Sequence, residues 1–318
     1  MENIKKGSNI SLMNLPESTL ECILKRLSPI ELIKMSEVCT SLRDRCRSDH
    51  LWDNHVKKKW GRIIGDVAYK EWQWHITTAK EEVNNLNQHS KENGSLGSFS
   101  VVWPLLCIGS YLEECKHLNS SLSNNSMMTL YLSLENGKFW FPAQVYRGLL
   151  VTHALVCYDS ETDTFQARQQ NGGSLRRGNN VQWHKLRACP VETSACVRYV
   201  SDCLEDLKPG DHIEIQRRLG RQNYYDWWYG VIGHMDSCNE NENDCRCRYC
   251  ETLIVEFKQY SQGSRMRRIK LHRKREQCEE QAEYYGGIRK LQNEEEIERW
   301  KKLLPLHLRK YYCEIKST

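Results

Sequence analysis

The sequence predicts an α+β protein: three or four short helices at the N-terminus, then a mainly antiparallel β domain, then one helix near the C-terminus. Three observations carry this prediction. Apolar residues recur at helical spacing over the first 60 residues, alternate with polar residues at a period of two after residue 126, and return to helical spacing at residues 294–306. Ten Trp and fifteen Tyr in 318 residues are enough for folded cores.

The first helix is predicted to begin at Pro16, because proline suits the first position of a helix. An apolar stripe with i, i+3, i+4 and i+7 spacing follows, formed by Leu20, Ile23, Leu24 and Leu27. A stripe of this kind must be covered by other parts of the chain or by a partner.

Three further helices are predicted before residue 61. Ser28-Pro29-Ile30-Glu31 has the pattern of a capping box with proline in the first turn, so a second helix starts there. A third is expected from about Thr40, and a fourth begins with Asp49 as its cap. Helices this short are marginal without tertiary packing. Apolar residues that so small a domain cannot bury are expected to meet a partner.

The residues Leu15-Pro16, Ile23-Leu24-x-x-Leu27-Ser28-Pro29, Leu32, Val38-Cys39, Leu42 and Leu51-Trp52 form a spaced set. This set resembles the F-box, and the text from Ser48 to Arg62 resembles a plant subfamily of it. The resemblance implies a three-helix domain that binds the Skp-type adaptor of Skp–cullin–F-box (SCF) ubiquitin ligases. The alternative is a plain helical bundle that belongs to the rest of the chain. The residues expected on the adaptor interface or in its immediate support are Leu15, Pro16, Ile23, Leu24, Leu27, Leu32, Val38 and Leu42.

Composition divides the chain into three parts. We expect the F-box at residues 10–62, a helical extension with a polar linker at 63–100, and a β-rich domain that recognises the target at 101–318. The linker prediction rests on residues 84–100, which are rich in Asn, Ser and Gly.

The β domain is predicted from alternation and turn signals. Asn136-Gly137 is a strong hairpin signal and predicts a turn between the first two strands. Pro142 makes the second strand an edge or bulged strand, and residues 171–180 are expected to form a Gly-rich basic loop. The predicted strands are 127–134, 139–146, 149–158, 164–168, a strand around Trp183, 212–216, 226–234, 252–257 and 265–275.

Two segments of this domain share one order of elements, from residue 136 to 168 and from residue 210 to 257. Each has aromatic and small residues followed by hydrophobic strands, and this order resembles small SH3-like barrels of the Tudor and Agenet type. The resemblance implies aromatic side chains that hold methylated residues by cation–π contact. Trp140, Trp227 and Trp228 are the candidate target-binding residues. The alternative is that each of them fills the core.

A cluster of potential metal ligands lies within residues 234–250: His234, Cys238, Cys245, Cys247 and Cys250. Thiolates and imidazole are the ligands that zinc takes in tetrahedral sites. The spacing differs from that of common zinc fingers, and the alternative is a loop of free thiols. No other cofactor is expected.

Other patterns limit the function. A net charge of +5 is too mild to require nucleic acid, and no apolar run approaches the ~20 residues of a membrane helix. The N-terminal residues lack the apolar core of a signal peptide, so we expect an intracellular protein of the nucleus, the cytoplasm or both. The basic residues between 265 and 275 are interpreted as a solvated strand face, with a nuclear import signal or a nucleic-acid patch as the alternatives.

No pattern indicates catalysis. Cys157 lies in an apolar stretch and is interpreted as a buried thiol rather than a nucleophile. We therefore expect a non-catalytic substrate receptor that joins the Skp-type adaptor, and through it cullin, to an unknown target protein. The rival hypotheses are a reader of modified protein tails, an enzyme with an unrecognised site, and a zinc-stapled scaffold.

Overall fold

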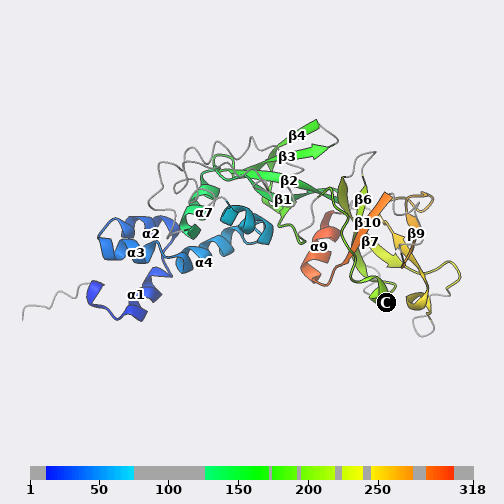
Figure 1. The fold of residues 1–318 in the computed structure, drawn as a ribbon, viewed down its shortest axis with the longest axis horizontal. Coiled ribbons are helices and arrows are strands. Elements are labelled where there is room, and N and C mark those ends of the chain that lie inside the picture. The colour runs from blue at the N-terminus through cyan, green and yellow to red at the C-terminus, as the bar shows by residue number, and fades with distance from the viewer. Residues whose placement is uncertain are drawn as a thin grey trace, which may run out of the picture.

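The computed structural model describes residues 12–74, 126–171, 174–191, 195–218, 224–238, 245–274 and 284–303. The molecule is elongated, with a helical lobe at one end and β structure through the middle to the other end (Figure 1). The predicted linker at residues 84–100 lies outside the described residues. Over the part of the chain that the structure describes, no helix is long and apolar enough to cross a membrane.

The helical lobe contains the predicted short helices. Its elements are η1 (Leu12–Asn14), α1 (Glu17–Leu24), α2 (Pro29–Ser36), α3 (Thr40–Cys46) and α4 (Asp49–Trp60). The capping box is confirmed: the Ser28 hydroxyl accepts from the Glu31 backbone N–H, and Glu31 accepts from the Ser28 backbone N–H. Pro16 lies one residue earlier than predicted, at the N-cap of α1, and Ser48 rather than Asp49 precedes α4.

The segment predicted as the first strand, residues 127–134, is instead a helix, α7 (Ser126–Glu135). Asn136-Gly137 ends this helix instead of turning a hairpin. Gly137 has φ +62°, its N–H donates to the carbonyl of Leu134, and the N–H of Lys138 donates to that of Ser133. These bonds form a Schellman motif, which needs a left-handed residue just as a tight hairpin does.

Within the described residues, ten strands form one antiparallel sheet. They are β1 (Phe141–Arg147), β2 (Leu150–Asp159), β3 (Thr164–Asn171), β4 (Ser174–Val181), β5 (Leu186–Arg187), β6 (His212–Arg218), β7 (Tyr225–Gly233), β8 (Thr252–Glu256), β9 (Arg268–His272) and β10 (Tyr285–Lys290). The predicted Gly-rich loop at 171–180 is wrong, because most of it is β4, which pairs with β3. Trp183 lies in the 3-10 turn η5 (Trp183–Lys185), and not in a strand.

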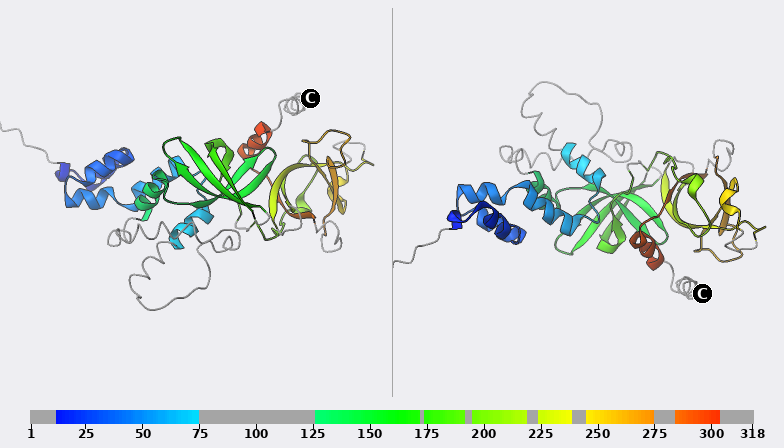
Figure 2. Two further views of the ribbon diagram at one scale, coloured as in Figure 1. Left: turned by 90° about the horizontal axis from the view of Figure 1, so that it is seen from above. Right: turned by 90° about the horizontal axis from the view of Figure 1, so that it is seen from below.

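The strand order repeats. In the first unit the order is β5-β1-β2-β3-β4, and in the second it is β10-β6-β7-β8-β9. Pairing between β2 and β7 joins the two units, which lie one after the other along the molecule (Figure 2). The internal repeat seen in the sequence is therefore a repeat of structure. β1 is not the edge or bulged strand predicted from Pro142, because it pairs with both β2 and β5. Pro142 itself lies beyond the two residues of β1 that pair with β5.

The helical lobe and the first unit share one hydrophobic core. The indole of Trp60, at the end of α4, packs within 5.2 Å of the Tyr158 ring and 5.1 Å of the Trp183 ring, measured between centroids. Lys59 forms an ion pair with Glu135 on α7. The lobe is therefore packed directly against the sheet.

A buried ionic network joins the two units. Arg187 on β5 makes two hydrogen bonds to Glu214 on β6, of 2.6 and 3.0 Å. Arg289 on β10 and the indole N–H of Trp300 bind the same carboxylate. Trp300 belongs to α9 (Glu294–Leu303), the predicted C-terminal helix. The network thus connects β5 of the first unit with β6, β10 and α9.

Candidate docking site and candidate metal centre

The eight candidate adaptor-binding residues divide by burial. Leu24, Leu32 and Leu42 are buried in the core of the helical lobe, where they support the lobe from inside. Leu15, Ile23 and Leu27 are half-buried at its surface, and Pro16 and Val38 are exposed. Val38 leaves 69% of its surface in solvent. The lobe therefore carries apolar side chains outside its own core.

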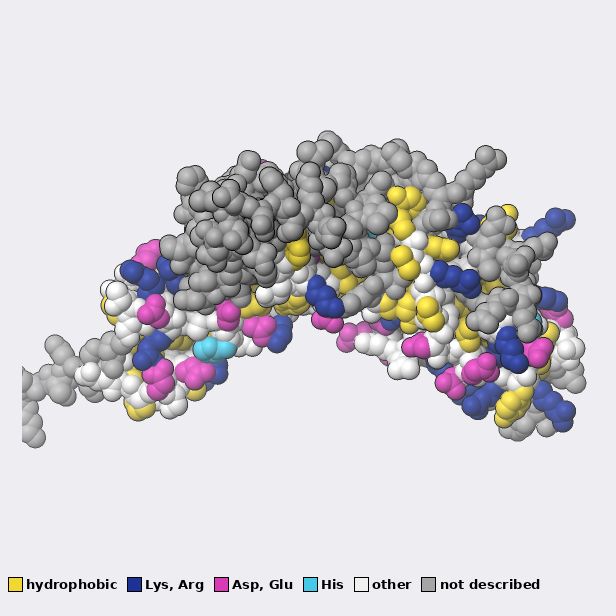
Figure 3. All heavy atoms as spheres, in the orientation of Figure 1, with side chains coloured by type: hydrophobic (Ala, Val, Ile, Leu, Met, Phe, Trp, Pro, Cys, Tyr) yellow, Lys and Arg dark blue, Asp and Glu magenta, His cyan; other side chains and the backbone are white. Residues whose placement is uncertain are grey.

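Ile30 is a further exposed apolar residue that the sequence interpretation did not assign to the interface. It lies at the start of α2 and is 65% exposed. Leu32, two residues later on the same helix, is buried, so Ile30 faces away from the core. The sequence contained a signal for this position, because Ile30 is an apolar residue that does not lie on the buried face of its helix. Hydrophobic side chains reach the surface at the lower end of the lobe, over α1, among charged groups (Figure 3).

A surface ion pair links α1 to α3, in addition to the buried Leu20 and Leu24. Arg45 on α3 forms an ion pair with Glu17 at the start of α1. The hydrogen bond from Arg45 lowers the pKa of Glu17. A negative side chain in the first turn of a helix also interacts favourably with the helix dipole. The half-buried Ile23 lies on this helix, and the half-buried Leu15 precedes its N-cap, Pro16.

The three candidate target-binding tryptophans lie in different environments. Trp227 is fully buried and packs in the core beneath β7, so its ring is closed to ligands in this fold. Trp140 and Trp228 are partly exposed, but each is covered by an arginine of the same chain. The guanidinium carbon lies 3.9 Å from the ring centroid for Arg168 over Trp140, and 4.2 Å for Arg217 over Trp228.

Trp228 belongs to an aromatic group in the second unit. Its ring stacks with that of Tyr260 at a centroid distance of 6.3 Å and meets Phe257 edge-on at 5.9 Å. The ring of Tyr285 in turn stacks on the ring of Phe257. Aromatic faces of this kind attract cations, and in the structure the cation over Trp228 is Arg217.

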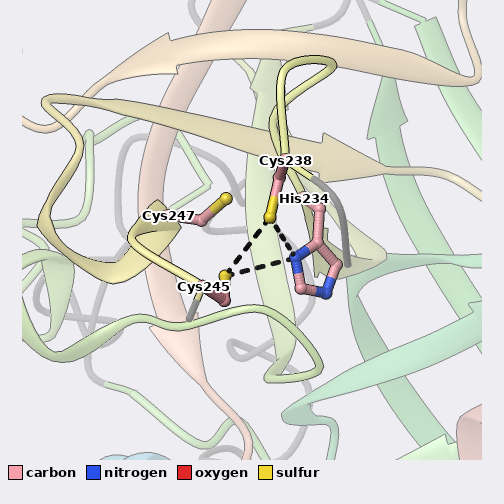
Figure 4. Close-up of side chains that lie close together, drawn as sticks. All are labelled: His234, Cys238, Cys245 and Cys247. Carbon is pink, nitrogen blue, oxygen red and sulfur yellow. Dashed lines mark hydrogen bonds between the residues drawn. The ribbon is translucent and has the colours of Figure 1, made fainter. Parts of the chain in front are cut away.

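Four of the five candidate metal ligands converge between the ends of β7 and β8 (Figure 4). The ligand atoms of His234, Cys238, Cys245 and Cys247 all lie within 4.8 Å of one another. Cys250 is not part of this group; its thiol donates to the backbone carbonyl of Arg246. The sequence spacing alone could not separate Cys250 from the others, because the turns between the ligands decide which thiols meet.

The two turns that supply the ligands are held by hydrogen bonds. Cys238 N–H donates to the carbonyl of Met235 in the first turn. Arg246 has φ −92° and ψ 3°, which turns the chain between Cys245 and Cys247 and starts η7 (Cys247–Tyr249). A tight turn at this point lets both thiols of a Cys-x-Cys pair face the same side.

Two arginines of the basic run after residue 264 make structural contacts. Arg273 is buried and donates to the backbone carbonyls of Arg248, Cys250 and Leu207. Arg268 forms ion pairs with Asp236 and Glu256. Two of the cations considered for a nucleic-acid patch are therefore already bound to groups of the same chain.

Cys157, the only cysteine considered as a nucleophile, is a structural thiol in this fold. It is buried, and its Sγ donates to the carbonyl of Gly137 at 2.9 Å. Burial raises its pKa to about 12, so the thiolate needed for attack is scarce near neutral pH.

Comparison with known proteins identifies the helical lobe. The model of the F-box domain matches residues 12–54. The Arabidopsis thaliana F-box protein At2g26850 is 43% identical over 311 residues, which cover 93% of this chain and 83% of that protein. The Arabidopsis thaliana F-box protein At2g41170 is 41% identical over 320 residues, covering 96% and 86%. The resemblance drawn from the N-terminal residues is confirmed, and the similarity to both relatives extends through the β domain.

Proposed function

Because the chain belongs to the F-box protein family, we propose that it bridges a Skp-type adaptor, and through it cullin, to a target protein for ubiquitination. F-box proteins have a general substrate-recognition role in SCF complexes, and they are in general non-catalytic adaptor subunits. The observation that carries the docking part is apolar exposure within the matched domain. Within this domain Pro16, Ile30 and Val38 are exposed, and Leu15, Ile23 and Leu27 are half-buried.

The packing of the lobe supports a mechanism based on proximity. An adaptor that only holds a target near a loaded ubiquitin carrier raises the effective concentration of the target's lysines. A flexible connection between the docking lobe and the target-binding domain would lower this effective concentration. Here the lobe shares a core with the first β unit, and the second unit is tied to the first by the Arg187–Glu214 bonds. The intracellular location expected from the sequence is part of this proposal.

The docking proposal is tested by changing Leu15 and Pro16 together to alanine. We expect Leu15→Ala with Pro16→Ala to abolish co-purification with the Skp-type adaptor, because interface energy concentrates in few residues, each worth roughly 2 kcal/mol or more. The measurement is a pull-down with purified adaptor, with circular dichroism to verify folding. Val200→Ala is the matched control, since Val200 is an exposed apolar residue in the β domain. Undiminished capture by the double variant contradicts the docking assignment.

A reader of methylated protein tails is the second candidate function, and the aromatic group around Trp228 is the observation that favours it. A methylated lysine would have to displace Arg217 from the Trp228 face. We therefore expect Arg217→Ala to strengthen binding to a methyl-lysine peptide array, and Trp228→Ala to remove it. If neither the wild type nor Arg217→Ala retains any methylated peptide, the reader function is excluded and the receptor proposal stands unchanged.

A further inference from the structure

The cluster at the β7–β8 junction has the geometry of a tetrahedral metal site. Zinc bound at about 2.3 Å to sulfur and about 2.0–2.1 Å to nitrogen places two sulfurs about 3.8 Å apart, and a sulfur and a nitrogen about 3.6 Å apart. The Cys238 and Cys245 sulfurs are 3.7 Å apart. They lie 3.5 and 3.3 Å from His234 Nδ1. These three atoms therefore already form one face of such a tetrahedron.

Cys247 supplies the fourth corner. Its sulfur lies within 4.8 Å of the other three ligand atoms, and it accepts a hydrogen bond of 3.3 Å from the backbone N–H of Met235. Backbone N–H groups directed at a coordinating thiolate stabilise its charge and orient it. From this geometry we propose that His234, Cys238, Cys245 and Cys247 bind one zinc ion that has a structural role.

The ligand set indicates which metal fits. Three thiolates and one imidazole are soft to borderline ligands, which zinc takes in Cys₃His sites and which calcium and magnesium avoid. Iron–sulfur clusters mostly use four cysteines. Four protein ligands leave no open coordination position, so the ion is structural and not catalytic.

Mutual hydrogen bonds do not explain the convergence of these groups. Sulfur is a weak donor and a weak acceptor, so three thiols around one imidazole gain little from one another. The surrounding chain nevertheless fixes both turns. Arg268 donates to the His234 carbonyl at 2.6 Å and to Asp236 at 2.7 Å, and Arg273 donates to the carbonyls of Arg248 and Cys250.

The ion would stabilise a part of the protein that buries few apolar residues. Of the four ligands only Cys247 is buried. Directly after it, η7 carries the exposed Tyr249 and Arg248, which line a cleft of about 340 Å³ together with Glu205, Glu251 and Lys274. Zinc would therefore hold one wall of this cleft, in the second β unit and beyond the first unit from the F-box lobe (Figure 2).

The test measures metal content in the full-length chain, purified without chelators after growth with zinc. We expect about one zinc per chain by elemental mass spectrometry. Cys245→Ser and Cys247→Ser should each reduce the zinc content at least tenfold. Cys250→Ser is the matched control and should keep it, because Cys250 lies close in sequence but outside the cluster. A wild-type chain without zinc, or a Cys250→Ser variant that loses it equally, overturns the proposal.

A second measurement guards against variants that fail to fold. The wild-type chain is treated with a thiol-alkylating reagent, with and without a zinc chelator, and the labelled cysteines are identified by mass spectrometry. We expect Cys238, Cys245 and Cys247 to be protected until the chelator is added, while the exposed Cys22 reacts in both samples. Labelling of the three without chelator overturns the proposal. So does protection that a reductant removes and a chelator does not, since a disulfide would then explain it.

Discussion

Asp226 shows how burial alone changes the chemistry of a single residue. It is buried on β7 beside Trp227. Loss of solvation raises its pKa to about 7, although the charge of Arg147 opposes the shift. In the folded protein this carboxyl therefore keeps its proton between about pH 4 and pH 7, whereas in the unfolded chain it has lost it. Unfolding over that range releases a proton, so this group's contribution to stability falls as the pH rises through it.

Asp226→Asn removes this dependence. We expect the free energy of unfolding of the variant, relative to the wild type, to be higher at pH 8 than at pH 4.5. Between pH 4.5 and pH 8, the free energy of unfolding of the variant minus that of the wild type should rise by about 1 kcal/mol or more, because one pKa unit corresponds to about 1.4 kcal/mol. Urea unfolding at the two pH values measures it. If the two proteins change in parallel between these pH values, Asp226 is not a carboxyl with a raised pKa.

At the scale of elements, α7 determines how the F-box lobe meets the sheet. Its N-terminus is capped from another helix, since the Asp49 carboxylate accepts from the Met127 N–H at 2.9 Å. Its C-terminus ends in the Schellman motif at Gly137. The helix contributes Leu130, Tyr131 and Leu134 to the shared core. Asp49 does act as a helix cap, as the sequence suggested, but for α7 and not for α4.

Gly137 and Gly148 allow a matched comparison, because both have φ +62°. A Cβ at Gly137 would overlap the carbonyl oxygen of Tyr158, whereas a Cβ at Gly148 meets no atom within 4 Å. We expect Gly148→Ala to cost about 1 kcal/mol for the left-handed backbone, and Gly137→Ala to cost at least about 1 kcal/mol more. Chemical unfolding of both variants measures the two costs. Equal costs would show that the contact with Tyr158 relaxes freely.

At the scale of the whole molecule, the buried carboxylate of Glu214 links the two β units, in addition to the pairing of β2 with β7. Burial would raise its pKa, but Arg187 and Arg289 more than compensate and lower it to about 2. A buried charge is tolerated only when it is paired and hydrogen-bonded, and here Trp300 adds a further donor. The carboxylate's contribution to stability is therefore present above its ordinary pKa of 4.5 and is lost as the pH falls towards 2.

Arg187→Met removes one partner and leaves the other charges in place. We expect the free energy of unfolding to fall by about 3–5 kcal/mol, because breaking a buried pair leaves an uncompensated charge. The control is Lys57→Met, which breaks an exposed ion pair with Asp53 on α4 and should cost less than about 1 kcal/mol. Equal losses in the two variants, compared by thermal or chemical unfolding, would contradict a special role for the network.

The elements that could be predicted from sequence are those with a strong local signal. The capping box at Ser28, the apolar stripe of the F-box helices, the alternating strands around β2, β6 and β7 and the helix α9 all rest on contacts within a few residues. The predictions of secondary structure were wrong where the local sequence is compatible with two different structures. Residues 127–134 are mostly apolar, with polar residues only at Thr129 and Ser133, and an Asn-Gly pair follows both strands and helices. The segment that forms β4 is polar and Gly-containing, and only its pairing with β3 makes it a strand.

The candidate sites divide in the same way. The sequence by itself determined the F-box, because its spaced apolar residues are a local pattern, and it determined which thiols were available for a metal. Only the tertiary structure decided that Val38 and Ile30 are exposed, that Trp227 is buried, and that His234 meets Cys247 and not Cys250. Burial and convergence depend on which distant segments pack together. That is set by the pairing of β7 with β8 and by the shared core, and no short stretch of sequence specifies it.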